Sequence, residues 1–223
     1  MQLTHLGHAC LLVQTADARI LLDPGVFSHG FEELTGLDAI VITHQHVDHV
    51  DVERLPAVLE SNDGAALLAE PELAAELARA GIEARPLHAG EQVEVAGASV
   101  RAIGGRHAVI HADIPRVGNV GLLVGARGEP TLFHPGDTYE YVPSASEAPD
   151  GVDVLAFPLN APWAALKELV EFVRAVQPAV AVPVHDALLS GTGRGLYLRV
   201  LGSLLPEKSE VRDIAGAGPT SLP

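Results

Sequence analysis

Short apolar runs separated by turn residues dominate the first third of the chain. Each run is brief for a helix, and the run at residues 39–43 is rich in β-branched side chains. Apolar runs of roughly four to eight residues between turn signals are typical of strands. We therefore expect strands at residues 2–6, 9–14, 19–23, 39–43 and 65–69.

Helical signals follow these strands. Residues 52–59 predict a helix with Asp51 as its candidate N-cap. Residues 71–80 predict a second helix, because Pro71 stands in its first turn and Gly81 follows its last turn. Alternation of strands with helices indicates buried strands that helices cover.

The middle of the chain carries the signals of antiparallel strands. Polar and apolar residues alternate at 92–95, and a strand resumes at 99–103 after a turn. The apolar runs 120–124 and 131–133 flank a loop with glycine and proline, so they predict a hairpin. The last third then returns to alternation, with strands expected at 153–157 and 179–184 and helices at 164–176 and 195–205.

Both halves of the chain thus run from strand-rich sequence to alternating strands and helices. This repetition predicts two similar mixed β-sheets that pack on each other with helices outside. The fold class is α/β in the broad sense that includes α+β folds. We expect a single domain over residues 1–223, with halves at about 1–110 and 111–223. A chain of this length can bury a substantial core.

Composition narrows the function classes. The chain is 48% hydrophobic with a mean hydropathy of +0.24, values typical of a folded globular protein. Its formal net charge of −15 disfavours binding to nucleic acid or to an anionic membrane. The one cysteine, Cys10, allows no intrachain disulfide, and no apolar segment has the length of a signal or a membrane span. We expect a soluble cytoplasmic protein that acts on a small molecule, and a homo-oligomer is compatible with the sequence.

The densest chemistry lies where the strand at 39–43 ends. His44, His46, Asp48 and His49 fall within six consecutive residues. Neutral imidazole and carboxylate are ligands that zinc and similar divalent metals prefer. One ion could hardly use all four and keep an open position, whereas two adjacent ions could, with further ligands from elsewhere. The alternative is a polar loop with solvated histidines, which four ligand-type residues at the end of a buried strand disfavour.

Three later strands end in the same kind of residue. His107 follows a strand and two glycines, Asp137 lies in the segment His-Pro-Gly-Asp-Thr, and His185 directly follows an apolar run. Gly136, before Asp137, indicates that the backbone passes close to another group. These three segments are the candidates that supply the remaining ligands of a two-metal site.

This order of residues resembles the metallo-β-lactamase-fold hydrolases. That family carries H-x-H-x-D-H after a strand, then a histidine, then an aspartate in a G-D-[ST] context, then a final histidine. The residues that match are His44, His46, Asp48, His49, His107, Asp137 and His185. The resemblance spans about residues 3–186, and the segment Gly7-His8-Ala9 looks closest to the ascorbate-6-phosphate-lactonase-like and uncharacterised hydrolase branch.

The resemblance implies a four-layer αββα sandwich that holds two divalent metal ions. His44, His46 and His107 would hold one ion. Asp48, His49 and His185 would hold the other ion, and Asp137 would bridge the two. Zinc is the default metal for these ligands, and manganese or iron are alternatives.

The implied activity is hydrolysis of a small ester, lactone or phosphoester by a metal-bridging hydroxide. Asp48 would orient this nucleophile or carry its proton. A diiron redox enzyme of the same fold is one alternative, but that branch resembles H-x-E-x-D and this chain has His46 at the carboxylate position. A non-catalytic metal-binding or regulatory protein is another alternative, and the complete ligand set argues against it.

Three histidines near these motifs keep more than one interpretation. His111 could replace His107 as a ligand, or it could act as a catalytic residue that contacts substrate or transfers protons. His8 could contact substrate or be structural. His134 is expected to pack or to support a ligand, since Asp137 carries the motif.

Three other residues also keep two interpretations. Asp23 could hold a ligand histidine or form the turn before Pro24. Asp186 could act in the same way or cap the segment that follows it. Trp163 could form a wall of the pocket or pack elsewhere.

Overall fold

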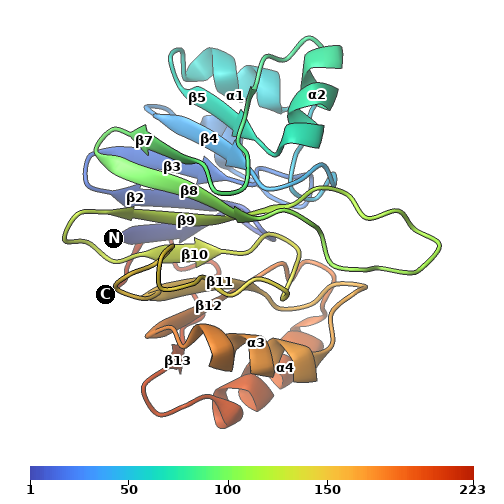
Figure 1. The fold of residues 1–223 in the computed structure, drawn as a ribbon, viewed down its shortest axis with the longest axis vertical. Helices are drawn as coiled ribbons and strands as arrows, with labels where there is room; N and C mark the ends of the chain where they lie inside the picture. Colours follow the sequence, from blue (N-terminus) through green and yellow to red (C-terminus); the bar gives the residue numbers. More distant parts are fainter.

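Two seven-stranded β-sheets face each other, and helices cover the outer face of each sheet (Figure 1). The computed structural model describes all of residues 1–223. The first sheet contains β1 (Gln2–His5), β2 (Leu11–Thr15), β3 (Ala18–Leu22), β4 (Ala39–Ile42), β5 (Ala66–Ala69), β6 (Arg85–Pro86) and β14 (Thr220–Ser221). The second sheet contains β7 (Gln92–Val95), β8 (Ala98–Gly104), β9 (Val120–Ala126), β10 (Leu132–His134), β11 (Val154–Pro158), β12 (Val180–Val184) and β13 (Glu210–Val211).

The two sheets share one mixed architecture. In the first, with order β14-β1-β2-β3-β4-β5-β6, the strands from β14 to β3 are antiparallel and those from β3 to β6 are parallel. In the second, with order β13-β12-β11-β10-β9-β8-β7, the strands from β7 to β10 are antiparallel and those from β10 to β13 are parallel. The chain therefore passes from one sheet to the other between β6 and β7, and β14 returns to the first.

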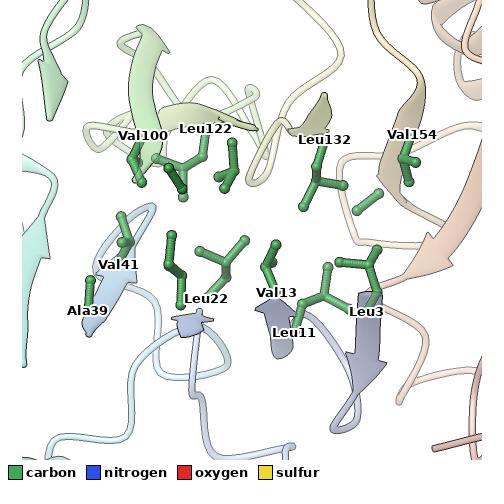
Figure 2. Packing of buried hydrophobic residues seen from close by; sticks show 14 of the residues in the cluster. Leu3, Leu11, Val13, Leu22, Ala39, Val41, Val100, Leu122, Leu132 and Val154 are labelled. Carbon is green, nitrogen blue, oxygen red and sulfur yellow. The ribbon is translucent and has the colours of Figure 1, made fainter. Parts of the chain in front are cut away.

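The main hydrophobic core fills the space between the sheets. It contains 25 buried residues, drawn mostly from alternate positions of strands in both sheets. Figure 2 shows Leu22 and Val41 of the first sheet pointing toward Leu122 and Leu132 of the second. Because burial contributes about 25 cal/mol per Å² of apolar area, this layer holds the sheets, and the loops at their ends, in a fixed relation.

Two smaller cores lie under the helices. Helices α1 (Leu55–Ser61) and α2 (Pro71–Arg79) bury 15 residues with the outer face of the first sheet, next to the short 3₁₀ helix η1 (Phe31–Glu33). Helices α3 (Leu166–Val176) and α4 (Gly191–Leu204) bury 13 residues with the second. The layer order is therefore αββα, as the resemblance implied. None of these helices has the length and apolar character needed to cross a membrane.

The helix ends differ most from the sequence prediction. Helix α1 begins at Leu55 and not at residue 52, because Asp51 caps a separate turn by accepting a hydrogen bond from the Arg54 backbone N–H at 3.0 Å. Helix α4 begins at Gly191 and not at residue 195, with Ser190 as its N-cap. The two-residue strands β6, β13 and β14 were not predicted, since pairing with a neighbour defines them and no local pattern does.

Candidate metal centre

The loops after β4, β8, β10 and β12 carry the predicted ligands and meet at one end of the two sheets. Strands β4, β10 and β12 belong to the parallel parts of their sheets. Ligand-binding loops of parallel sheets gather at the carboxyl ends of the strands. The long loop after β8 extends from this end, on the right of Figure 1.

His44, His46 and His107 form the first group of ligand atoms. One nitrogen of each lies within 4.8 Å of the others. His44 Nε2 and His46 Nδ1 are 3.1 Å apart, and the ring centroids of His46 and His107 are 4.6 Å apart. This group offers a metal ion three imidazole nitrogens and no formal charge.

His8, Asp48, His49 and His185 form the second group with the same spacing. Asp48 Oδ2 lies 3.1 Å from His8 Nε2 and 3.3 Å from His185 Nε2. His8 is the member that the ligand motif does not contain. Its Nδ1 accepts a hydrogen bond from the Ala187 backbone N–H at 3.3 Å, so its Nε2 carries the proton that Asp48 accepts. His8 thus supports Asp48 as a hydrogen-bond donor.

Asp137 lies between the two groups. Its Oδ1 is 3.1 Å from His49 Nε2. Its Oδ2 is 3.4 Å from His107 Nε2 and 3.3 Å from His185 Nε2. Asp137 also forms a third ligand group with His44 and His49. One carboxylate therefore contacts histidines of both sets, which is the placement that a bridging ligand needs.

Hydrogen-bond acceptors hold the ring nitrogens that face away from the centre. Backbone carbonyls accept from Nδ1 of His107 and from Nδ1 of His185, both at 2.7 Å. The Thr43 hydroxyl lies 3.0 Å from His44 Nδ1. A proton on Nδ1 leaves the Nε2 lone pair available for a metal ion, and the acceptor fixes the plane of the ring.

Asp23 holds the loop that carries the main motif. Its buried carboxylate accepts hydrogen bonds from His49 Nδ1 and from the Thr43 hydroxyl, both at 2.7 Å. It also accepts from the Thr43 backbone N–H at 2.8 Å, and His134 Nε2 lies 3.2 Å away. Asp23 therefore supports a ligand histidine directly, while Thr43 extends the same network to His44. The buried His134 belongs to this supporting layer.

The atoms that face the centre lack hydrogen-bond partners. Nε2 of His49, Nε2 of His185 and Oδ1 of Asp137 are buried, and neighbouring polar atoms are close but not aligned for hydrogen bonds. Buried polar atoms are satisfied in most proteins, so three such atoms in one place require an explanation. Electron-pair donors of these types are those that a divalent cation binds. The residues present therefore fit a metal centre.

The electrostatics of the centre point the same way. Burial lowers the pKa of His44 well below its usual value, so this imidazole is neutral at pH 7. Burial also opposes charge on His185, but Asp137 and Asp48 raise the pKa of His185 to about 9. The pKa of Asp137 is held well below its usual range, because His185 and His49 outweigh its burial. The centre thus concentrates negative charge balanced by histidine protons, which a metal cation can replace.

Two glycines let the backbone pass close to ligand loops. A Cβ on Gly25 would lie 1.9 Å from the Asp48 carbonyl oxygen. Gly136 has a φ of +63°, and a Cβ there would lie 2.3 Å from Oδ1 of Asn119. The same Asn119 oxygen accepts a hydrogen bond from the Asp137 backbone N–H at 2.9 Å. The close approach predicted at Gly136 is therefore to Asn119, which positions the loop of Asp137.

Trp163 contacts the centre directly. Its indole Nε1 donates a hydrogen bond to Asp137 Oδ2 at 3.0 Å. The sequence placed Trp163 near the pocket or in unrelated packing, but no local signal linked it to Asp137. Residues 26 positions apart on different loops can be joined only by the fold.

Two other residues lie outside the ligand groups. His111 is exposed, and its Nδ1 accepts a hydrogen bond from the Asp113 backbone N–H at 3.1 Å. The groups contain His107 and not His111, and the catalytic role of His111 stays a prediction. Asp186 accepts a hydrogen bond from Arg194 of α4 at 2.6 Å, so it anchors α4 and does not support a ligand histidine.

Comparison with known proteins agrees with this fold and with a metal-dependent hydrolase family. A family model described as "Beta-lactamase superfamily domain" matches residues 2–185. Protein Rv0786c of Mycobacterium tuberculosis is 48% identical over 219 residues, 95% of this chain and 99% of that protein. A UPF0173 metal-dependent hydrolase of Aeropyrum pernix is 31% identical over 209 residues, 82% of this chain and 81% of that protein. The chain belongs to the UPF0173 metal-dependent hydrolase family of the beta-lactamase superfamily.

Solved structures share the fold of this UPF0173 protein. The metallo-beta-lactamase fold protein YhfI from Bacillus subtilis aligns with a TM-score of 0.66 at 13% identity, covering 95% of both chains. CmlA, a diiron beta-hydroxylase from Streptomyces venezuelae, aligns with a TM-score of 0.73 at 17% identity, over 96% of this chain and 53% of that chain. The αββα prediction is confirmed, and a shared fold does not by itself select a reaction.

Proposed function

We propose that this UPF0173 protein is a dinuclear metal-dependent hydrolase that cleaves an ester, lactone or phosphoester bond in a small molecule. One observation carries the proposal: seven side chains from four loops converge, and three buried donor atoms among them, on His49, His185 and Asp137, have no hydrogen-bond partner. The family name of the relatives supports the same activity.

Each proposed ligand is assigned to one of the two metal ions or to both. His44, His46 and His107 would hold one ion, Asp48, His49 and His185 would hold the other, and Asp137 would join the two sets. When bound, two divalent ions supply a hydroxide nucleophile at neutral pH and polarise the electrophile. We take zinc as the default metal, with manganese or iron as alternatives.

Asp48 is the residue that we assign to proton handling. Its carboxylate is only partly buried, and Oδ2 accepts a hydrogen bond from His8. This bond fixes the side chain from one side and leaves its other oxygen available to orient a nucleophile and accept its proton. We also propose that this protein is most similar to the ascorbate-6-phosphate-lactonase-like branch of the superfamily. The Gly7-His8-Ala9 segment, which supplies this hydrogen-bond donor, supports that assignment.

A diiron redox enzyme is the competing proposal, since CmlA shares the fold. The ligand set favours hydrolysis, because the group that contains His46 is made of nitrogen donors alone. Nitrogen-rich sites suit zinc, which has no redox chemistry, whereas carboxylate ligands suit iron of the oxygen-activating kind.

Metal analysis tests the centre before any substrate is known. We expect protein purified without chelator to contain close to two equivalents of metal per chain, and exhaustive chelation to abolish activity until metal is restored. His88→Ala removes an exposed histidine outside the ligand groups, and this control variant should keep the metal content of the wild type. A folded and active protein without metal would overturn the proposal.

Activity is tested with a panel of lactones, carboxylate esters, thioesters and phosphodiesters on wild type and on Asp48→Ala. We expect at least one class to be hydrolysed by wild type and a loss of about 100-fold or more in kcat for Asp48→Ala, the scale of general-base catalysis. Unchanged kcat in Asp48→Ala with full metal content would refute the assignment of Asp48.

A further inference from the structure

A cavity of about 210 Å³ opens beside the metal centre. Its lining consists of Ala108, Val109, Tyr139, Glu140, Trp163 and Glu168. Ala108 follows the ligand His107 in the chain, and Trp163 donates its indole N–H to Asp137. The rings of His107 and Trp163 have centroids 6.1 Å apart. The Trp163 wall of the cavity therefore contacts two of the proposed ligands, His107 and Asp137.

The lining of this cavity combines apolar and aromatic side chains with a similar share of polar surface. The rings of Tyr139 and Trp163 meet edge to face, with centroids 4.8 Å apart. The Tyr139 hydroxyl donates to the Pro158 carbonyl at 2.5 Å, so its polar end is already occupied. Val109 adds an exposed aliphatic side chain. The cavity offers ring and methyl surface, with few free hydrogen-bond donors for an anion.

The charged groups at the cavity are acidic. Glu140 and Glu168 are exposed members of the lining, and no lysine, arginine or histidine belongs to it. The guanidinium of Arg116 donates to Glu140 of the lining at 2.7 Å and to the His107 carbonyl at 2.6 Å, so both partners already occupy it. Glu168 has no ion-pair partner. Among the side chains that line this cavity, a phosphate or carboxylate would meet negative charge and no cationic group.

We propose that this cavity binds the substituent next to the bond that is cut, and that it selects an apolar neutral or cationic group against an anionic one. The inference deepens the proposed hydrolase function and rests on it for the activity experiment. Aromatic faces with a nearby carboxylate bind apolar groups and organic cations, while the same carboxylate repels anions. The substrate class is thus an ester or lactone with an apolar or ammonium-bearing substituent.

The occupancy and charge of the cavity can be measured without a substrate, because Trp163 is the one tryptophan of the chain. Fluorescence quenching by acrylamide, iodide and caesium probes the cavity with a neutral, an anionic and a cationic molecule. We expect the ratio of caesium to iodide quenching constants to be higher for Trp163 than for free N-acetyltryptophanamide, and acrylamide to quench Trp163 readily. Glu168→Lys should lower the ratio of caesium to iodide quenching constants by about threefold or more, since it reverses a charge at the cavity.

Glu171→Lys is the matched control, because Glu171 lies on the same helix, is exposed, and does not line this cavity. Glu171→Lys changes the net charge by the same amount as Glu168→Lys. Its effect on the ratio of caesium to iodide quenching constants should be less than half the effect of Glu168→Lys. Glu168→Gln gives the same direction with a smaller effect, and covers the case in which Glu168→Lys fails to fold. Equal responses of the Glu168 and Glu171 variants would overturn the inference, since the net charge would then explain both.

Activity supplies the second arm, with metal-loaded wild type and three p-nitrophenyl esters of similar size. The acyl groups are butyryl, succinyl and 4-trimethylammoniobutyryl, and bis(p-nitrophenyl) phosphate serves as an anionic phosphodiester. We expect kcat/KM for the anionic succinyl ester to be about tenfold below that for butyryl, and Glu168→Lys to narrow this gap while Glu171→Lys preserves it.

The outcomes separate the two proposals. Fastest hydrolysis of the succinyl ester or of the phosphodiester would overturn the inference and leave the hydrolase function intact. If none of the four compounds is hydrolysed but the quenching of Trp163 follows the expected pattern, the result counts against the proposed ester chemistry. It does not count against the charge selectivity of the cavity.

Discussion

The two ligand groups differ in how the fold supports them. The group of His44, His46 and His107 consists of imidazoles, and neutral acceptors hold two of its outer ring nitrogens. The group of Asp48, His49 and His185 contains a carboxylate, and the buried carboxylate of Asp23 holds His49. The first group reaches the Asp23 carboxylate only through the Thr43 hydroxyl, which contacts His44. The second group donates to Asp23 directly, through His49.

Asp137 joins the two groups, so its removal should have the largest effect. We expect Asp137→Ala to reduce metal content from about two equivalents per chain toward zero, because this carboxylate contacts histidines of both groups. Elemental analysis of folded protein, checked by circular dichroism, measures the change. Retention of one full equivalent would mean that Asp137 serves only one group.

Removal of one histidine should separate the groups. We expect His107→Ala to lose the metal of the first group and His185→Ala that of the second, each variant keeping about one equivalent, because each side chain contributes to one set. Isothermal titration of apo protein with zinc would give one binding event in place of two. Equal loss of both metals in His107→Ala would contradict the assignment of the ligands to two separate groups.

The support of Asp23 should matter more for the second group. We expect Asp23→Asn to weaken that metal by about 10- to 100-fold, the usual effect of losing an outer partner of a ligand histidine. Competition with a chelating dye measures the affinity. Asp153→Asn is the control, since Asp153 accepts a backbone hydrogen bond at 2.8 Å far from the ligands in sequence and is absent from every ligand group. The same loss in the control would point to a general loss of stability.

The smallest effect is expected at His111. Because its side chain is exposed and outside the ligand groups, His111→Ala should keep both metals and their affinities within about twofold. A drop in kcat at full metal content would support its catalytic role. If metal is lost from His111→Ala and kept in His107→Ala, the choice of third ligand must be reversed.

Local patterns were enough to place most strands and the densest part of the site. The motif from His44 to His49 combines an apolar strand with ligand-type residues at its end, and both signals lie within a few positions. The hairpin of β9 and β10 was predicted in the same way, from two apolar runs around a loop, and its antiparallel pairing confirms it. Helix boundaries were less predictable, because the cap at Asp51 stabilises a turn and not the helix that follows.

The sequence left the supporting contacts of the centre open, because each joins distant positions. Asp23 was expected either to hold a ligand histidine or to form a turn, and the fold selects the first role. The bond of His8 to Asp48 spans 40 residues, that of Asp23 to His49 spans 26, and that of Trp163 to Asp137 spans 26. Histidine, aspartate and tryptophan each have ordinary structural uses. Their roles depend on which strands are neighbours in the fold, and the hydrophobic periodicity of the sequence does not specify these neighbours.

The sequence by itself determined the chemistry that this protein can offer. Residue types set the ligands, and the short apolar runs before them set the strand ends from which they project. The tertiary structure alone decided how these ends combine: the packing of two sheets brought Asp137 and His185 against the motif from His44 to His49, and it formed the cavity beside Trp163. The physical reason is that hydrophobic periodicity encodes burial along one strand, whereas the meeting of two sheets is fixed by the shared core between them.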